Sequence, residues 1–436
     1  MALGGGTFVA QNKILPGAYI NFVSKPRAIG RIGERGVVAV PLSLDWGSDD
    51  VFTVESGDFM TKAEKIFGYS YTHEKLAPIR ELFCGAKTLV VYKINGKGEK
   101  ATANAGGLTV TAKYSGVRGN DISIIVRKNI DDDSFYDVVT VIDGSYKDIQ
   151  TVSDISELVS NDFVDFSGSG VFEVTAGSNL DGGTNTEVNG ESYSEFLGLI
   201  ECYDFNTLVY DGDDETTKKL FVSFTKRMRD DEGVKFVTVL HDYSAADCEG
   251  VISVKNETSE QKTGLVYWVS GKEAGAEVNE SLTNALYDGE LFVVARYSKS
   301  DYEKAIEEGQ LVFYNDGENI RVLRDINTFT SFSSDKNSDF SSNRIMRVLD
   351  SIGNDVARIF SEYYLGKQSN NKQGRNLFKS ELISYHEQLM TLGAIEDFTS
   401  DDITVSQGSE KTDVDVYLSV MPVDAMEKLY MKVEIV

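Results

Sequence analysis

The chain has 436 residues, of which 41% are hydrophobic and 11% aromatic, and its formal net charge is −26. This length predicts several domains, because single hydrophobic cores stop growing at about 250–300 residues. An acidic chain without a Lys/Arg-rich block is a poor partner for nucleic acid. The sequence has no apolar run of about 18 residues and no basic start followed by an apolar stretch, so it predicts neither membrane insertion nor export by a signal peptide.

The three cysteines, Cys84, Cys202 and Cys248, are far apart and show no CxxC spacing. An odd number of isolated cysteines favours reduced thiols over a disulfide framework. We therefore expect a cytosolic setting.

Residues 1–26 are interpreted as an N-terminal arm. A glycine-rich start leads to Pro16-Gly17, after which Ala18, Ile20 and Phe22 alternate with the residues between them. A period of two residues is typical of a β-strand, so this arm is expected to contain a terminal strand.

Residues 27–94 are interpreted as a first α/β segment that packs with the core. Two helical patterns, over 58–68 and 72–85, end at Gly68 and Gly85. A glycine in this place predicts a left-handed C-cap for each helix. The apolar run TLVVYKI then predicts a strand.

The sequence pattern changes at about residue 95. Residues 95–185 consist of short β-rich runs such as LTVTAKY and DISIIVRK, separated by Gly, Asn and Asp, which predicts an inserted, outer β-sandwich-like domain. Residues 186–330 alternate helical patterns with apolar strands, which predicts a central domain with a parallel or mixed α/β sheet. Within it, Asp316-Gly317 between two apolar runs predicts a hairpin.

Residues 331–420 predict a C-terminal α+β domain with two helices. The first covers 341–365 and begins at an N-cap, either Ser341 or Ser342. The second covers 376–392 and ends before a glycine. Apolar residues at spacings of three and four define one face of each helix, namely Ile345, Val348, Ile352, Val356 and Ile359 in the first and Phe378, Leu382, Tyr385 and Leu389 in the second.

Residues 421–436 are interpreted as a C-terminal strand arm. In its last stretch, LYMKVEIV, the apolar residues Leu429, Met431, Val433 and Ile435 alternate with polar neighbours. A lone strand leaves backbone N–H and C=O groups unpaired, so it either docks on its own sheet or adds to the sheet of another molecule. The pattern by itself leaves both options open.

A search for metal or acid–base chemistry finds no convincing set of residues. His73, His241 and His386 lie on different segments without a carboxylate or cysteine at ligand spacing. The pair His241-Asp242 resembles a base with its orienting acid, but adjacent residues on a strand point to opposite faces. We therefore predict no metal site and no catalytic residue.

The glycine pattern at 30–36 reads GxxGxxG and lacks the preceding strand of a phosphate-binding loop, and no P-loop motif occurs. Asp211, Asp213 and Glu215 have the spacing of a calcium loop, but Thr216 stands where an EF-hand needs glycine. These carboxylates are better explained by a helix N-terminus. The sequence thus predicts no cofactor and no enzyme.

Several stretches, in this order, resemble the contractile tail sheath family of phages, defective prophages and phage-tail-like bacteriocins of Gram-positive bacteria. They are PGAYI in the N-terminal arm, YSGVRGNDISIIV, LDGGTN, GLVYWVSGKEAGAEVNESLTN, RDINTFTSFSSDK, NRIMRVLDSI, YYLGKQSNNKQGR and MPVDAMEKLYMKVEIV. Together they span nearly the whole chain.

This resemblance implies a structural protein whose central α/β domain is similar in topology to subtilisin but has no working triad. Copies are expected to form a helical homopolymer of stacked rings around an inner tail tube. The polymer is expected to contract without nucleotide hydrolysis and to drive the tube through a target cell envelope. Baseplate and tail terminator proteins are the further partners. Assembly is expected in the bacterial cytoplasm, followed by release as part of a tail.

In this family, the terminal arms add strands to small sheets of neighbouring subunits, which assigns that role here to Ala18, Ile20 and Phe22 and to the alternating residues of the C-terminal arm. A helix of the C-terminal domain contacts the tube. Our candidate is the helix 376–392, whose polar side is expected to carry Arg375, Lys379 and His386, with the helix 341–365 as the second choice.

The competing interpretation is a soluble α/β enzyme or ligand-binding protein whose terminal strands complete its own sheet. That class predicts a monomer or small oligomer at all concentrations, whereas a sheath subunit forms hollow cylinders.

Overall fold

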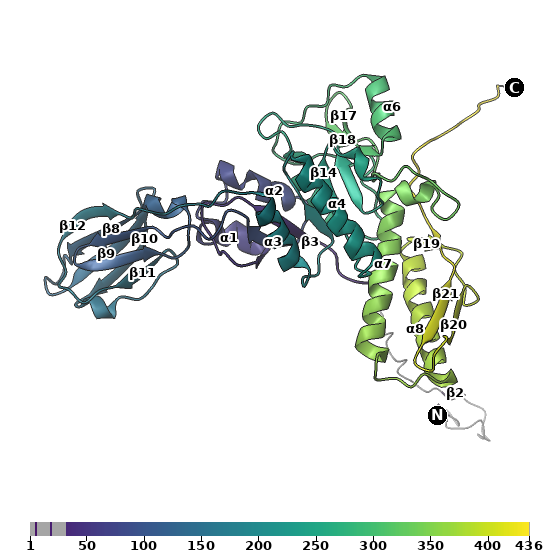
Figure 1. The fold of residues 1–436 in the computed structure, drawn as a ribbon, viewed down its shortest axis with the longest axis horizontal. Helices are drawn as coiled ribbons and strands as arrows, with labels where there is room; N and C mark the ends of the chain where they lie inside the picture. Colours follow the sequence, from purple (N-terminus) through teal and green to yellow (C-terminus); the bar gives the residue numbers. More distant parts are fainter. Residues whose placement is uncertain (1–4, 7–17, 20–31, 436) are drawn as a thin grey trace. The chain divides into compact units, whose positions relative to one another are not determined.

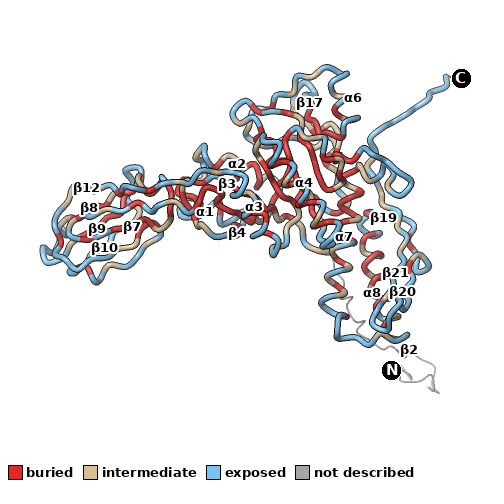
Figure 2. Tube along the Cα trace, in the orientation of Figure 1, coloured by how far each residue is buried: buried red, intermediate tan, exposed pale blue. Residues whose placement is uncertain are grey.

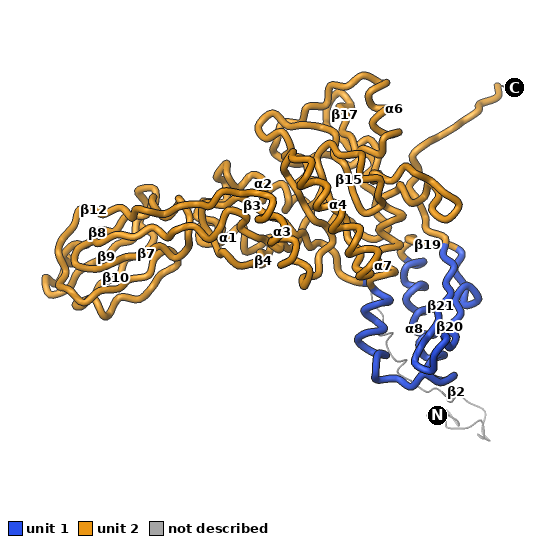
Figure 3. The backbone as a smooth tube through the Cα atoms, in the orientation of Figure 1, with its two compact units in different colours: residues 1–32, 355–391, 397–420 blue, residues 33–354, 392–396, 421–436 orange. Residues whose placement is uncertain are grey.

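The computed structural model describes residues 5–6, 18–19 and 32–435 (Figure 1). The chain divides into two compact units (Figure 3). The larger unit comprises 33–354, 392–396 and 421–436, and the smaller unit comprises 1–32, 355–391 and 397–420. The six-part division expected from the sequence is finer than this one and stays a prediction.

The larger unit contains a seven-stranded sheet in the order β16-β15-β14-β13-β3-β5-β4. All neighbouring strands are parallel except β4 and β5. This arrangement confirms the predicted parallel or mixed α/β sheet. The strands are β3 (Val37–Leu42), β4 (Phe52–Glu55), β5 (Thr88–Lys93), β13 (Thr207–Val209), β14 (Val237–His241), β15 (Val251–Val254) and β16 (Gln310–Leu311).

Helices cover both faces of this sheet, and successive strand residues are buried on opposite sides. Val38 and Val40 join one apolar cluster, whereas Ala39 between them joins the other, as the alternation of a strand requires. The first cluster includes α1 (Ser56–Phe67), α2 (Ala77–Leu82) and α5 (Leu265–Gly275), and the second includes α3 (Gly190–Ile200) and α4 (Glu215–Asp230). In Figure 2 the central strands are almost continuously buried.

The two glycines expected to cap helices behave differently. Gly68 has a φ of 77° and caps α1 as predicted. The prediction for Gly85 is wrong, because α2 ends at Leu82 and Gly85 is not left-handed. A Cβ on Gly85 would lie 2.4 Å from the carbonyl oxygen of Gly271. Glycine is needed there because the end of α2 approaches the backbone of α5 closely.

A β-sandwich is inserted between β5 and α3, as the sequence predicts. One sheet has the order β10-β9-β8-β12 and the other β11-β7-β6, and their inner faces enclose a third apolar cluster. The strands are β6 (Thr102–Ala105), β7 (Leu108–Ala112), β8 (Ile122–Lys128), β9 (Tyr136–Ile142), β10 (Ser145–Val152), β11 (Val164–Ser167) and β12 (Thr175–Asn179).

The larger unit is completed by α6 (Lys299–Glu307) and by the hairpin of β17 (Phe313–Asn315) and β18 (Ile320–Val322). This is the hairpin predicted at Asp316-Gly317, and Gly317 has a φ of 106°. Farther along the chain, β19 (Ile395–Glu396) pairs with β22 (Met421–Pro422).

The two C-terminal helices are α7 (Asn343–Ile359), which continues as a π-helical turn over Phe360–Tyr364, and α8 (Lys372–Thr391). The hydroxyl of Ser342 accepts a hydrogen bond from the N–H of Ile345 at 3.4 Å, so Ser342 is the N-cap of α7. The boundary between the two units falls within α7.

The smaller unit contains α8 and two small sheets. The antiparallel hairpin of β20 (Ile403–Gln407) and β21 (Val414–Leu418) contacts α8 through β20. In the N-terminal segment, β1 (Gly5–Gly6) and β2 (Ala18–Tyr19) form a short parallel pair.

Candidate assembly surfaces

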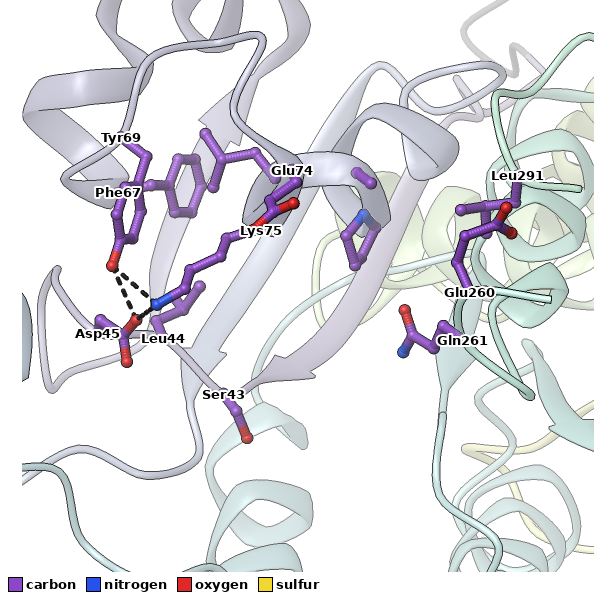
Figure 4. Close-up of a pocket in the computed structure, with 13 residues that line it drawn as sticks. Ser43, Leu44, Asp45, Phe67, Tyr69, Glu74, Lys75, Glu260, Gln261 and Leu291 are labelled. Carbon is purple, nitrogen blue, oxygen red and sulfur yellow. Dashed lines mark hydrogen bonds and ion pairs between the residues drawn. The ribbon is translucent and has the colours of Figure 1, made fainter. Parts of the chain in front are cut away.

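A cavity of about 520 Å³ lies beside the carboxyl end of β3, where the order of the parallel strands reverses (Figure 4). Such a reversal is the usual ligand site of an open α/β sheet. The hydroxyl of Tyr69 donates to Asp45 at 2.8 Å, and the ammonium of Lys75 bonds to both. The hydrogen bond to Asp45 raises the pKa of Lys75 to about 12. These three groups thus satisfy one another and leave no free nucleophile or base among themselves.

The ring of His241 is 1% exposed and pairs with Asp213, at 3.1 Å between Nδ1 and the carboxylate. The neighbouring Asp242 follows the end of β14 with a left-handed φ of 40° and points elsewhere, to Lys255 at 2.9 Å. Burial lowers the pKa of His241, against the effect of Asp213. Among the described residues no partner reaches its Nε2 atom, so the pair has no nucleophile to activate.

Asp213 also bonds to Lys262 at 2.6 Å, and the adjacent Asp214 caps the N-terminus of α4. These contacts account for Asp213, the middle residue of the calcium-loop spacing, and for Asp214 beside it. Within residues 5–6, 18–19 and 32–435, no group of three or more His, Cys, Asp or Glu side chains could hold a metal ion. In the same part of the chain, no helix is long and apolar enough to cross a membrane.

The C-terminal tail, residues 428–435, is the most exposed stretch of the described chain (Figure 2). It forms no helix or strand. The four residues predicted to form its apolar face have exposed fractions of 87% for Leu429, 74% for Met431, 71% for Val433 and 98% for Ile435. Within the part of the chain that the structure describes, these apolar side chains lack the partner that an alternating segment requires.

The N-terminal arm is described at two short places only. The backbone of Ala18 pairs with Gly5 in the parallel β1–β2 ladder. The other two predicted arm residues, Ile20 and Phe22, lie outside the described residues.

The β20–β21 hairpin is a sheet without a third described strand. Ile403 is buried and Val405, Val416 and Leu418 are half-buried, whereas Thr404, Asp415 and Tyr417 are exposed. Both outer edges of such a two-stranded sheet present unpaired backbone groups, and an isolated hairpin is only marginally stable.

The three residues predicted for the polar side of α8 do not share one environment. Arg375 is half-buried and donates to the side-chain oxygen of Asn370 at 2.9 Å, and Lys379 is half-buried. The prediction that His386 lies on the polar side is wrong, because its side chain is 0% exposed. It stacks on Phe398 with ring centroids 5.0 Å apart, and its Nδ1 bonds to the carbonyl of Leu382 at 2.7 Å.

Four domain models of phage tail sheath proteins match the chain. The Gp18 domain III N-terminal region matches residues 35–94, the beta-sandwich domain 96–185, the central domain 186–328 and the C-terminal domain 335–436. The chain belongs to the phage tail sheath family.

Two individual proteins resemble this chain over nearly its full length. The phage-like element PBSX protein XkdK of Bacillus subtilis is 32% identical and covers 99% of this chain and 100% of its own. The crystal structure of a sheath tail protein from Desulfitobacterium hafniense has a TM-score of 0.83 at 43% identity, covering 96% of this chain and 100% of its own.

A more distant structure, the helical sheath of the anti-feeding prophage in its contracted state, has a TM-score of 0.57 and covers 97% of this chain and 99% of its own. At 12% identity this likeness shows the fold alone. These comparisons and the observed strands confirm the predicted multidomain α/β fold with a β-sandwich domain.

Sequence reasoning missed the role of Arg118 in the YSGVRGNDISIIV stretch of this sheath chain. Its guanidinium donates to the carbonyl of Gly68 at 2.8 Å and pairs with Asp143 at 2.5 Å. It also lies over the ring of Tyr69, 4.5 Å from the centroid. Arg118 therefore fastens the sandwich to the central sheet. An arginine among glycines was the signal available, but its partners lie far away in the sequence.

Sequence reasoning also missed a buried ionic cluster at the start of α7. Arg347, 3% exposed, pairs with Glu273 at 2.5 Å and with Asp325 at 3.5 Å. Burial raises the pKa of Glu273 to about 8, against the effect of Arg347. Arg35 donates to the backbone carbonyls of Glu273 and Ala276, each at 2.9 Å. A buried charge of this kind tolerates the loss of its partner poorly.

Proposed function

We propose that this sheath protein polymerises as helically stacked rings around an inner tail tube and contracts without nucleotide hydrolysis to drive the tube through a target envelope. The observation that carries the proposal is the C-terminal tail, whose alternating apolar residues are exposed in the single chain. Assembly would take place in the bacterial cytoplasm, with tube, baseplate and tail terminator proteins as partners.

The tail is proposed to act as a connector that adds a strand to the β20–β21 hairpin of a neighbouring subunit. The hairpin carries its apolar residues on one face, and a strand added at an edge in the matching register would place Leu429, Met431, Val433 and Ile435 on that same face. Main-chain pairing supplies affinity. The N-terminal arm, with Ala18, Ile20 and Phe22, is proposed to connect subunits in the same manner. Such connectors permit rigid-body rotation of subunits while the lattice stays joined.

The test of the connector is deletion of residues 429–436. We expect a folded protomer, with the unfolding temperature of the wild type, that no longer forms cylinders in negative-stain electron microscopy when tube protein is present. Deletion variants that still build stable sheaths would refute the connector role.

Contact with the tube is proposed for α8 through Arg375 and Lys379, without His386. Reversal of both charges to glutamate is expected to release the sheath from the tube. Lys299→Glu, on the exposed face of α6, is the matched control, because it changes the net charge without touching α8. Unchanged co-assembly of the α8 variant would refute this assignment.

The free energy of contraction is proposed to reside in the assembled lattice. At −26 charges per subunit, contacts between copies should depend on electrostatic screening. We expect the stability of the extended sheath to shift between low and high ionic strength. A contraction threshold that is the same at both would count against this account.

A further inference from the structure

Within the described residues, the contacts of the C-terminal segment with the rest of the chain end at Glu427. Before this residue, the segment is fixed to the larger unit: the N–H of Val423 donates to the carbonyl of Ala394 at 3.0 Å, and Asp424 accepts from the hydroxyl of Ser342 at 3.1 Å. Beyond it, as far as the described chain extends, the one side-chain ion pair joins Lys432 to Glu434 within the tail.

Glu427 itself is held by two groups from separate segments. Its carboxylate accepts a hydrogen bond from Nε of Arg324 at 2.8 Å and another from the hydroxyl of Thr283 at 2.9 Å. Its side chain is 19% exposed, whereas Met426 and Leu429, on either side, are fully exposed or nearly so. A charge-assisted contact of this kind is stronger than a neutral hydrogen bond.

The groups that hold Glu427 are themselves fixed by the buried cluster. The hydroxyl of Thr283 accepts from the N–H of Asp325 at 2.9 Å. The carboxylate of Asp325, 2% exposed, accepts from the N–H of Leu282 at 2.9 Å and from Asn343 at 2.8 Å. The socket for Glu427 is therefore preorganised by buried contacts that reach the start of α7.

We propose that Glu427 is a clamp that fixes the start of the connector strand to the larger unit. With the clamp closed, the free connector is limited to residues 428–435, which reach at most about 29 Å when fully extended. With the clamp open, while Val423 and Asp424 keep their own contacts, residues 425–435 are free to reach about 40 Å. A longer, looser tether lowers the effective concentration of the strand at its acceptor. The clamp thus sets the position from which the connector meets a neighbouring subunit. It would also transmit a pull on the connector to the buried cluster.

This inference rests on the proposed connector function, so the experiment includes the deletion of residues 429–436 beside the clamp variants. The variants are Glu427→Gln, Arg324→Gln and the double change, made in the full-length chain. Glu303→Gln is the matched control, because Glu303 is a glutamate on α6, outside the connector, and also forms an ion pair, with Lys299 at 3.4 Å. The critical concentration for polymerisation with tube protein is measured by sedimentation, and the unfolding temperature of the protomer is measured in parallel.

We expect Glu427→Gln to raise the critical concentration about tenfold, with an unchanged unfolding temperature, and Glu303→Gln to leave both at wild-type values. The double variant should be no worse than either single one, because both remove the same interaction. If the deletion abolishes polymerisation while Glu427→Gln matches Glu303→Gln, the clamp is wrong and the connector stands. If the deletion variant polymerises normally, both are wrong.

Discussion

Residues 43–50 and residues 428–435 are both irregular segments, yet their side chains have opposite surroundings. In the first, Trp46 is 1% exposed and packs into the sandwich core, while Asp49 accepts from Ser115 at 2.8 Å. In the second, every described residue is exposed. An irregular backbone therefore does not mean that the side chains of a segment are exposed. For a segment that alternates apolar residues and yet is exposed throughout the described chain, we propose a partner on another molecule.

The largest expected effect is at Trp46, which joins the central sheet to the sandwich. Its ring lies 5.3 Å from Tyr114 and 6.3 Å from Phe163, between centroids. Trp46→Ala removes a large buried ring, and we expect a loss of about 4 kcal/mol in the free energy of unfolding. Urea denaturation measures it, and Tyr430→Ala in the tail, 88% exposed, should cost nothing. If both variants lost the same free energy of unfolding, the difference in burial between the two segments would have no effect on stability.

The next effect is at Arg347, in the buried cluster. Arg347→Met keeps much of the side-chain volume but leaves Asp325, 2% exposed, without its cation. We expect a loss of about 3 kcal/mol in the same measurement, because a buried charge without its partner is costly. An unchanged free energy of unfolding would mean that the cluster contributes little to the stability of the protomer.

A smaller effect is expected at Arg118. Arg118→Lys keeps the positive charge but loses the planar fork that reaches Gly68, Asp121 and Asp143 together. We expect a loss of about 1–2 kcal/mol. Hydrogen exchange should show faster opening at the sandwich junction than in the wild type, and unchanged exchange there would contradict the fastening role.

The smallest effect is a change in pH dependence at Glu273. Burial is the chief cause that raises the pKa of this carboxyl from its ordinary value of 4.5 to about 8 in the fold. The folded state therefore keeps a proton that the unfolded chain releases, so the stability from this group is present below pH 4.5 and is lost as the pH rises to about 8. Glu273→Gln should unfold with a weaker decline in stability over this range. Parallel pH profiles for the variant and the wild type would show that Glu273 does not titrate there.

Much of the fold could be predicted from local patterns. Alternating helix and strand texture indicates the central sheet, short runs with Gly and Asn indicate the sandwich, and Asp316-Gly317 indicates the hairpin, because each pattern depends on neighbouring residues only. Gly68 was predictable for the same reason. Gly85 was not, since its requirement comes from the backbone of Gly271 on a distant helix.

The site residues divide in the same way. The alternation of the tail is a local property, and the sequence by itself predicts which of its residues would form an apolar face. His386 sits at helical spacing from Arg375 and Lys379, but Phe398 packs on its ring, a contact that helix periodicity does not contain. Only the tertiary structure decided that His386 is buried, that Arg118 meets Gly68, and that Glu427 meets Arg324 across 103 positions of sequence. Local patterns follow from the geometry of one helix or strand, whereas these pairings follow from how distant segments are brought together by the packed core.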